Sequence, residues 1–91
     1  MKDFIINMVL ALFMGVLIGG AAIGLELVSI PAVLISTTIG VAAGAAFREW
    51  RRNTASEPRP SGWFVPYFFA EVLALIINAF IAHAQAASIA A

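Results

Sequence analysis

Two long segments without a charged side chain, residues 4–25 and 27–47, follow one another in the first half of the chain, separated only by Glu26. An apolar segment of about 20 residues is the length that an α-helix needs to cross the ~30 Å hydrocarbon core of a bilayer. A soluble globule needs more polar surface than this chain of 91 residues offers, because 63% of it is hydrophobic and 11% is charged. The sequence therefore predicts an integral membrane protein.

A third apolar segment, from Trp63 to about residue 84, follows a short polar one. Residues 48–62 hold most of the basic side chains, together with Pro58, Pro60 and Gly62, which interrupt helices. We predict an all-α membrane protein in which a glycine-rich helical hairpin is followed by a third transmembrane helix. Residues 1–91 form a single domain, with membrane helices over about 4–25, 29–47 and 63–84, a turn over 26–31, a cytoplasmic loop over 48–62 and a short tail over 85–91.

The arginines predict the orientation of the chain. Short loops rich in Lys and Arg stay in the cytoplasm, whereas the turn between the first two helices carries only Glu26. We expect an inner (plasma) membrane protein with its N-terminus in the cytoplasm and its C-terminus outside, which cysteine labelling at Ser56 and Ser88 tests. A secretory signal peptide at the N-terminus is the alternative. The side chains expected to anchor the cytoplasmic interface, through headgroup and lipid contacts, are Arg48, Trp50, Arg51, Arg52, Trp63 and Tyr67.

Small residues recur at intervals of four in the predicted hairpin, so each row shares one helix face. The rows consist of Ala11, Gly15 and Gly19, of Gly20 and Gly24, and of Ala32, Ser36, Gly40 and Gly44. In lipid, helices associate where small residues let their backbones approach closely. Two interpretations follow: the two helices of the hairpin pack on each other, or the rows join copies of the chain into an oligomer.

Polar side chains form one seam along the third predicted helix. Glu71, Asn78 and Gln85 are spaced by seven residues. If the helix begins near Trp63, Glu71 lies near the bilayer midplane and is a candidate for binding a proton or a cationic substrate. If it begins at Pro66, Glu71 lies only about 8 Å inside the helix end and pairs with the arginine-rich loop or with the positive helix terminus.

Catalytic and cofactor-binding patterns are not recognisable in this sequence. It has no cysteine, one histidine and a formal net charge of zero, so we expect no metal site, no cofactor and no nucleic-acid partner, and no enzymatic activity. Asn7 is a candidate for a hydrogen bond between helices or for a headgroup contact. The string Ala70-Glu71-Val72 resembles the region around the membrane glutamate of small multidrug resistance transporters. The resemblance covers three residues, and no function is carried over from it.

Three functions remain open for such a chain. The first is a non-enzymatic membrane protein that acts by helix packing and oligomerisation, such as a holin-like or other pore-forming protein. The second is an accessory or structural subunit of a larger membrane complex. The third is a small proton-coupled transporter that uses Glu71. The expected partners are membrane lipids together with either further copies of the chain or the other subunits of a complex.

Overall fold

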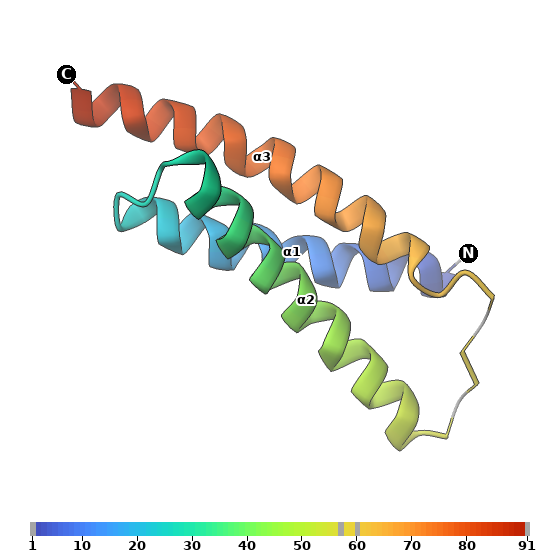
Figure 1. Cartoon of the computed structure of the whole chain (residues 1–91). Coiled ribbons are helices and arrows are strands. Elements are labelled where there is room, and N and C mark those ends of the chain that lie inside the picture. Colours follow the sequence, from blue (N-terminus) through green and yellow to red (C-terminus); the bar gives the residue numbers. More distant parts are fainter. Residues whose placement is uncertain (1, 57, 60, 91) are drawn as a thin grey trace.

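The computed structural model, which describes residues 2–56, 58–59 and 61–90, consists of three long helices that run up, down and up (Figure 1). They are α1 (Lys2–Gly24), α2 (Ile30–Thr54) and α3 (Val65–Ala90). Each helix is long and apolar enough to cross a membrane. The predicted all-α fold with three membrane-spanning helices is confirmed.

A short turn with a cap on each side joins α1 to α2. Glu26 adopts a left-handed conformation (φ 70°) just after α1. The N–H of Glu26 donates to the carbonyl of Ile23, and the N–H of Leu27 donates to the carbonyl of Ala22. This pair of hydrogen bonds is the Schellman motif, which ends many helices. Ser29 then caps α2 by accepting a hydrogen bond from the N–H of Ala32. The turn therefore fixes α1 and α2 as antiparallel neighbours.

Two helices extend beyond their predicted ends. α2 continues through residues 48–54, which we expected in the loop, and α3 continues through most of the expected tail. The predicted ends rested on polarity, but residues 48–54 contain neither proline nor glycine, and their arginines and glutamate are good helix formers. The cap at Ala55, whose N–H donates to the carbonyl of Arg51, marks the end of α2.

Small residues bring α1 and α2 into backbone contact. A Cβ atom added at Gly40 would lie 2.5 Å from the carbonyl oxygen of Met14, and one added at Gly44 would lie 2.9 Å from the Cα of Ala11. Gly15 lies in the same interface, because its Cα would be 2.8 Å from a Cβ atom added at Gly40. These rows of small residues therefore pack within one subunit, as one of the two interpretations predicts.

In the first half of α2 the buried face is shifted by one position from the predicted row, whereas Gly40 and Gly44 are buried as predicted. Val33 and Thr37 are buried in line with Gly40 and Gly44, whereas Ser36 is half-buried. The Ser36 hydroxyl donates to the carbonyl of Ala32 at 2.7 Å and so bonds within its own helix. Thr37, rather than Ser36, is therefore the polar side chain that α2 directs into the bundle.

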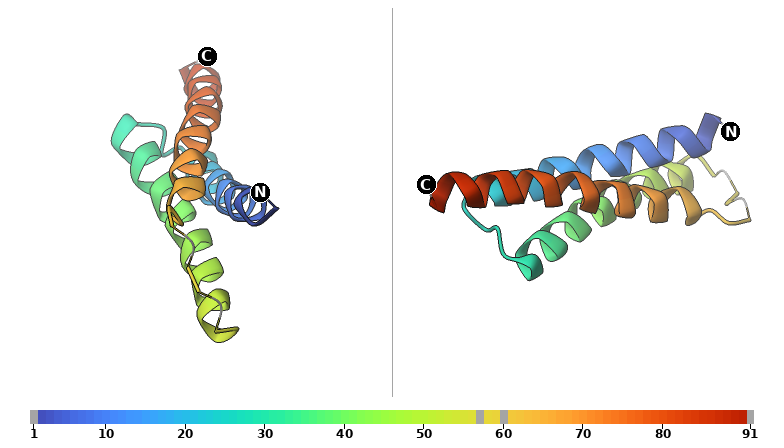
Figure 2. Two further views of the ribbon diagram at one scale, coloured as in Figure 1. Left: turned by 90° about the vertical axis from the view of Figure 1, so that its right-hand side faces the viewer. Right: turned by 90° about the horizontal axis from the view of Figure 1, so that it is seen from above.

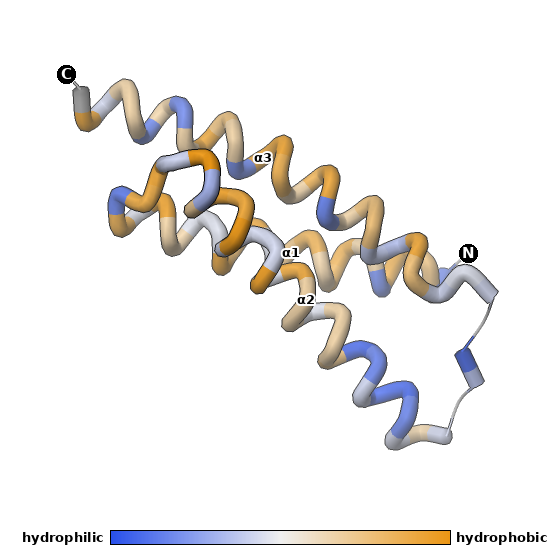
Figure 3. Tube along the Cα trace, viewed as in Figure 1, coloured by the Kyte–Doolittle hydropathy of each residue, from blue (hydrophilic) through white to orange (hydrophobic). Residues whose placement is uncertain are grey.

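The outer surface of the bundle is apolar along most of its length (Figure 3). Large apolar side chains are exposed on all three helices, for example Phe13, Ile39 and Phe80. α1 packs extensively on both other helices, whereas α2 crosses them at an angle and contacts α3 least (Figure 2). The molecule is 52 Å long, so its ends reach beyond a hydrocarbon core of ~30 Å.

Candidate functional site

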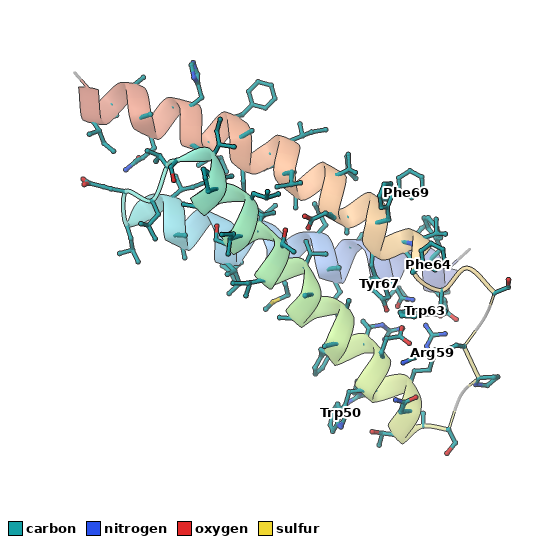
Figure 4. The ribbon with its side chains drawn as sticks, in the orientation of Figure 1. Trp50, Arg59, Trp63, Phe64, Tyr67 and Phe69 are labelled. Atoms are coloured by element: carbon teal, nitrogen blue, oxygen red, sulfur yellow. The ribbon has the colours of Figure 1, made fainter. Side chains whose placement is uncertain are left out.

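A carboxylate on α2, Glu49, joins that helix to α3 and to the loop between them. Its Oε2 accepts a hydrogen bond from the hydroxyl of Tyr67 at 2.7 Å, and its Oε1 lies 2.8 Å from Nε of Arg59. Nε of Arg52, one turn along α2, lies 3.7 Å from Oε2. Glu49, Arg52 and Tyr67 are all buried. We call Glu49, Arg52, Arg59 and Tyr67 the Glu49 clasp; Figure 4 labels Arg59 and Tyr67.

Further contacts hold this end of the bundle together. The guanidinium of Arg59 lies over the ring of Trp63, 4.5 Å from its centroid, and Trp63 meets Tyr67 edge to face. On the other side of α2, Nε of Arg48 donates to Oδ1 of Asn7 at 2.6 Å. Asn7 therefore bonds across helices, which is one of its two predicted roles. All three helices are tied together at the end that carries the arginines.

Only some of the predicted interfacial anchors face outward. Trp50 is exposed and turned away from the bundle, and Arg51 is exposed as well (Figure 4). Arg52 and Tyr67, two other predicted anchors, are buried within the bundle, where each contacts Glu49. The acidic residue that both contact, Glu49, is not among the residues predicted from the sequence. An acidic residue next to three arginines, at 48, 51 and 52, is nevertheless a recognisable signal for an ion pair within the chain.

A second polar group lies in the middle of the bundle. Asn78 of α3 is fully buried, and its Nδ2 donates to the carbonyl of Gly15 at 3.2 Å and to Oγ1 of Thr37 at 2.8 Å. Gly19 leaves the room for this amide, because a Cβ atom there would collide with Asn78 Nδ2 and lie 2.6 Å from Thr37 Oγ1. One side chain of α3 thus bonds to both other helices.

Glu71, one of the predicted polar residues, contacts Thr38 of α2, which follows the Thr37 bound by Asn78. Thr38 Oγ1 donates to Glu71 Oε2 at 2.7 Å on the surface of the bundle, where Thr38 is exposed and Glu71 is half-buried. Glu71 Oε1 and Asn78 Oδ1 are buried and have no hydrogen-bond partner among the described residues. We call Thr37, Thr38, Glu71 and Asn78 the central polar group. Gln85, the third predicted member of the seam, is half-buried two turns further along α3.

The depth of Glu71 follows from its neighbours in α1. α3 begins at Val65, so Glu71 is only six residues, or about 9 Å, inside its own helix. However, α1 and α3 run parallel, and Ala74 of α3 packs against Gly15 of α1. Glu71, three residues before Ala74, is therefore level with Leu12, next to the midpoint of α1. It is close to the start of α3 and at the same time near the middle of the bundle.

The central polar group offers oxygen atoms rather than a catalytic constellation. The described residues contain no cluster of three or more His, Cys, Asp or Glu side chains that could hold a metal ion. In the Glu49 clasp two arginines lie beside one carboxylate, whereas Glu71 has only a hydroxyl beside it. Comparison with family models, with curated proteins and with solved structures finds no match for this chain.

Proposed function

We propose that this chain is a small pore-forming membrane protein whose copies assemble around the face of the bundle that carries Glu71 and Thr38. The observation that carries the proposal is the hydrogen bond between these two side chains, at the level of the middle of α1 and on the outer surface of the bundle. A polar pair in that place is suited to a water-filled passage.

Contact with lipid is an unfavourable environment for this pair. A charged side chain at the centre of a bilayer costs about 2.5–3.5 kcal/mol on insertion scales, and such residues face protein or water instead. The lysine and arginine side chains of the described residues lie at the ends of α1 and α2 and in the loop, and none of them forms a salt bridge with Glu71. Assembly with the Glu71 faces turned inward removes the carboxyl group from lipid.

Lateral association needs a surface that the fold of the subunit leaves free. Gly15, Gly40 and Gly44 are used within the subunit, but Gly20 and Gly24 have no heavy atom within 4 Å of an added Cβ. This second row of α1 leaves room for a helix of a neighbouring copy to approach closely. It supports assembly without displacing any contact within the bundle.

A ring of Glu71 carboxylates favours cations. Rings of acidic side chains select cations in channels, because they replace part of the hydration of the ion and attract its charge. The proposed protein thus acts through packing and electrostatics, without catalysing a reaction. In the proposed orientation the Glu49 clasp lies on the cytoplasmic side.

Ion flux through liposomes that contain the purified protein tests this function. We expect flux that favours cations over anions in the wild type, and a loss of this preference in Glu71→Gln. Glu26→Gln is the matched control, because it removes the same charge from an exposed residue of the turn. The measurement is the reversal potential in a salt gradient, together with the assembly state by native mass spectrometry. A monomer without flux that co-purifies with other proteins would instead identify an accessory subunit.

A further inference from the structure

We propose that the interface between α2 and α3 contains a binding site for a small monovalent cation, coordinated by Glu71 Oε1 and Asn78 Oδ1. Both atoms are buried acceptors without a hydrogen-bond partner among the described residues. Buried polar atoms in folded proteins are nearly always bonded to protein, to water or to an ion, so each of these acceptors calls for a partner. Glu49 Oε1 is a third such atom, but it has Nε of Arg59 at 2.8 Å, whereas Glu71 Oε1 and Asn78 Oδ1 have no cation beside them. The site lies within one subunit and does not depend on assembly.

The two side chains of α3 bond to adjacent threonines of α2. Seven residues separate their Cα atoms by about 10.5 Å along the helix. The Asn78 amide lies against Gly19 of α1 and donates to the carbonyl of Gly15, one turn earlier in that helix. Glu71 bonds to Thr38, the residue that follows the Thr37 bound by Asn78. The carboxylate and the amide are therefore held on consecutive residues of α2.

The orientation of the Asn78 amide is set by its partners. Nδ2 faces the carbonyl oxygen of Gly15 and the hydroxyl of Thr37. Exchanging the amide nitrogen and oxygen would place Oδ1 against the Gly15 carbonyl, which is also an acceptor. Oδ1 is therefore the atom left over, and it requires a donor or a cation.

The chemistry of the site selects the class of cation. Carboxylate, amide and hydroxyl oxygens are hard ligands that suit hard cations. The central polar group carries a single negative charge, so a monovalent ion neutralises it, whereas a divalent ion leaves an excess positive charge in a medium of low dielectric. Sodium is the probe of choice because it is small and hard.

Thermal unfolding in detergent tests the site on the full chain. Sodium replaces choline at constant ionic strength, with lithium and potassium as parallel arms, and helix content is followed by circular dichroism. We expect Tm to rise with sodium and then to saturate in the wild type and in Glu26→Gln. In Glu71→Gln we expect the apparent affinity to fall by about tenfold or more, the range typical of disrupted metal sites. Identical responses of Glu71→Gln and the wild type would overturn the proposal.

Sodium NMR of the wild type measures binding without a variant. We expect saturable line broadening that lithium reverses and choline does not. Absence of broadening would overturn the proposal. Stabilisation by lower pH in buffer without sodium, with no response to any of the cations, would assign the position to a proton instead. Neither readout depends on flux, so failure of the cation site is distinguishable from failure of the pore.

Discussion

Two glutamates in the interface between α2 and α3 each accept a hydrogen bond from a hydroxyl group of the other helix. Glu49 of α2 accepts a hydrogen bond from the hydroxyl of Tyr67 of α3, and Glu71 of α3 accepts one from the hydroxyl of Thr38 of α2. The two bonds have the same length. What differs is the charge around them, because Glu49 has two arginines within 4 Å and Glu71 has none among the described residues.

This difference separates a structural carboxylate from a candidate functional one. At the Glu49 clasp the charges are paired, and the group joins α2, α3 and the loop. Glu71 has no lysine or arginine beside it among the described residues, and it lies at the level of the bundle's middle. An acidic side chain that costs free energy in lipid and has no basic partner in its own subunit is a candidate for a function.

The largest effect on stability is expected for Glu49→Gln. Removing one partner of a buried ion pair leaves the other charge uncompensated and costs about 3–5 kcal/mol. We expect the low end, about 3 kcal/mol, because the Arg59 side chain is 45% exposed, whereas Arg52 is 7% exposed. The measurement is the free energy of unfolding in detergent.

The matched substitution Glu71→Gln tests the difference between the two glutamates in the same assay. In sodium-free buffer we expect it to leave the unfolding free energy within about 1 kcal/mol of the wild type, since no cation is left unpaired by it. A loss as large as that of Glu49→Gln would show that both glutamates are structural and would contradict the distinction.

An intermediate effect is expected for Gly19→Ala. The added Cβ collides with Asn78 Nδ2 and Thr37 Oγ1, and overpacking of this kind costs about 1–3 kcal/mol. The change disturbs the central polar group and leaves the Glu49 clasp intact. Gly20→Ala is the control, because it meets no atom within 4 Å and removes a glycine from the same helix. Equal unfolding free energies for the two variants would show that the amide of Asn78 relocates freely.

Much of the fold was predictable because the hydropathy and length of a single segment are enough to identify a membrane-spanning helix. The three spans follow from hydropathy and length, and Gly15, Gly40 and Gly44 were recognised from their spacing. The end of α2 was not, because a polar helix continues beyond the apolar span until a cap ends it at Ala55. Hydropathy reports the solvent that a segment prefers, and it does not report where a helix stops.

The candidate site depended on pairings between helices that the sequence does not contain. Glu71 and Asn78 were found as a seam, but the depth of Glu71 was ambiguous because it was measured from the start of α3 alone. It is set by the register against α1, through Ala74 and Gly15. Glu49 was missed for the same reason, since its partner Tyr67 lies on another helix.

A last pair of substitutions removes the two hydroxyl donors, and the smallest loss among the variants that remove a bond is expected for Thr38→Val. Tyr67→Phe removes a buried bond to a carboxylate, and we expect a loss of about 1.5–3 kcal/mol in unfolding free energy. Thr38→Val removes the corresponding bond on the surface of the bundle, and interhelical bonds of this kind in membranes contribute about 0.6 kcal/mol. The two substitutions delete the same chemical group from equivalent bonds, so their difference reports the environment of each glutamate. Equal losses for the two variants would mean that the paired charge around Glu49 adds nothing to the strength of its bond, and Glu49 and Glu71 would then have to be regarded as equivalent.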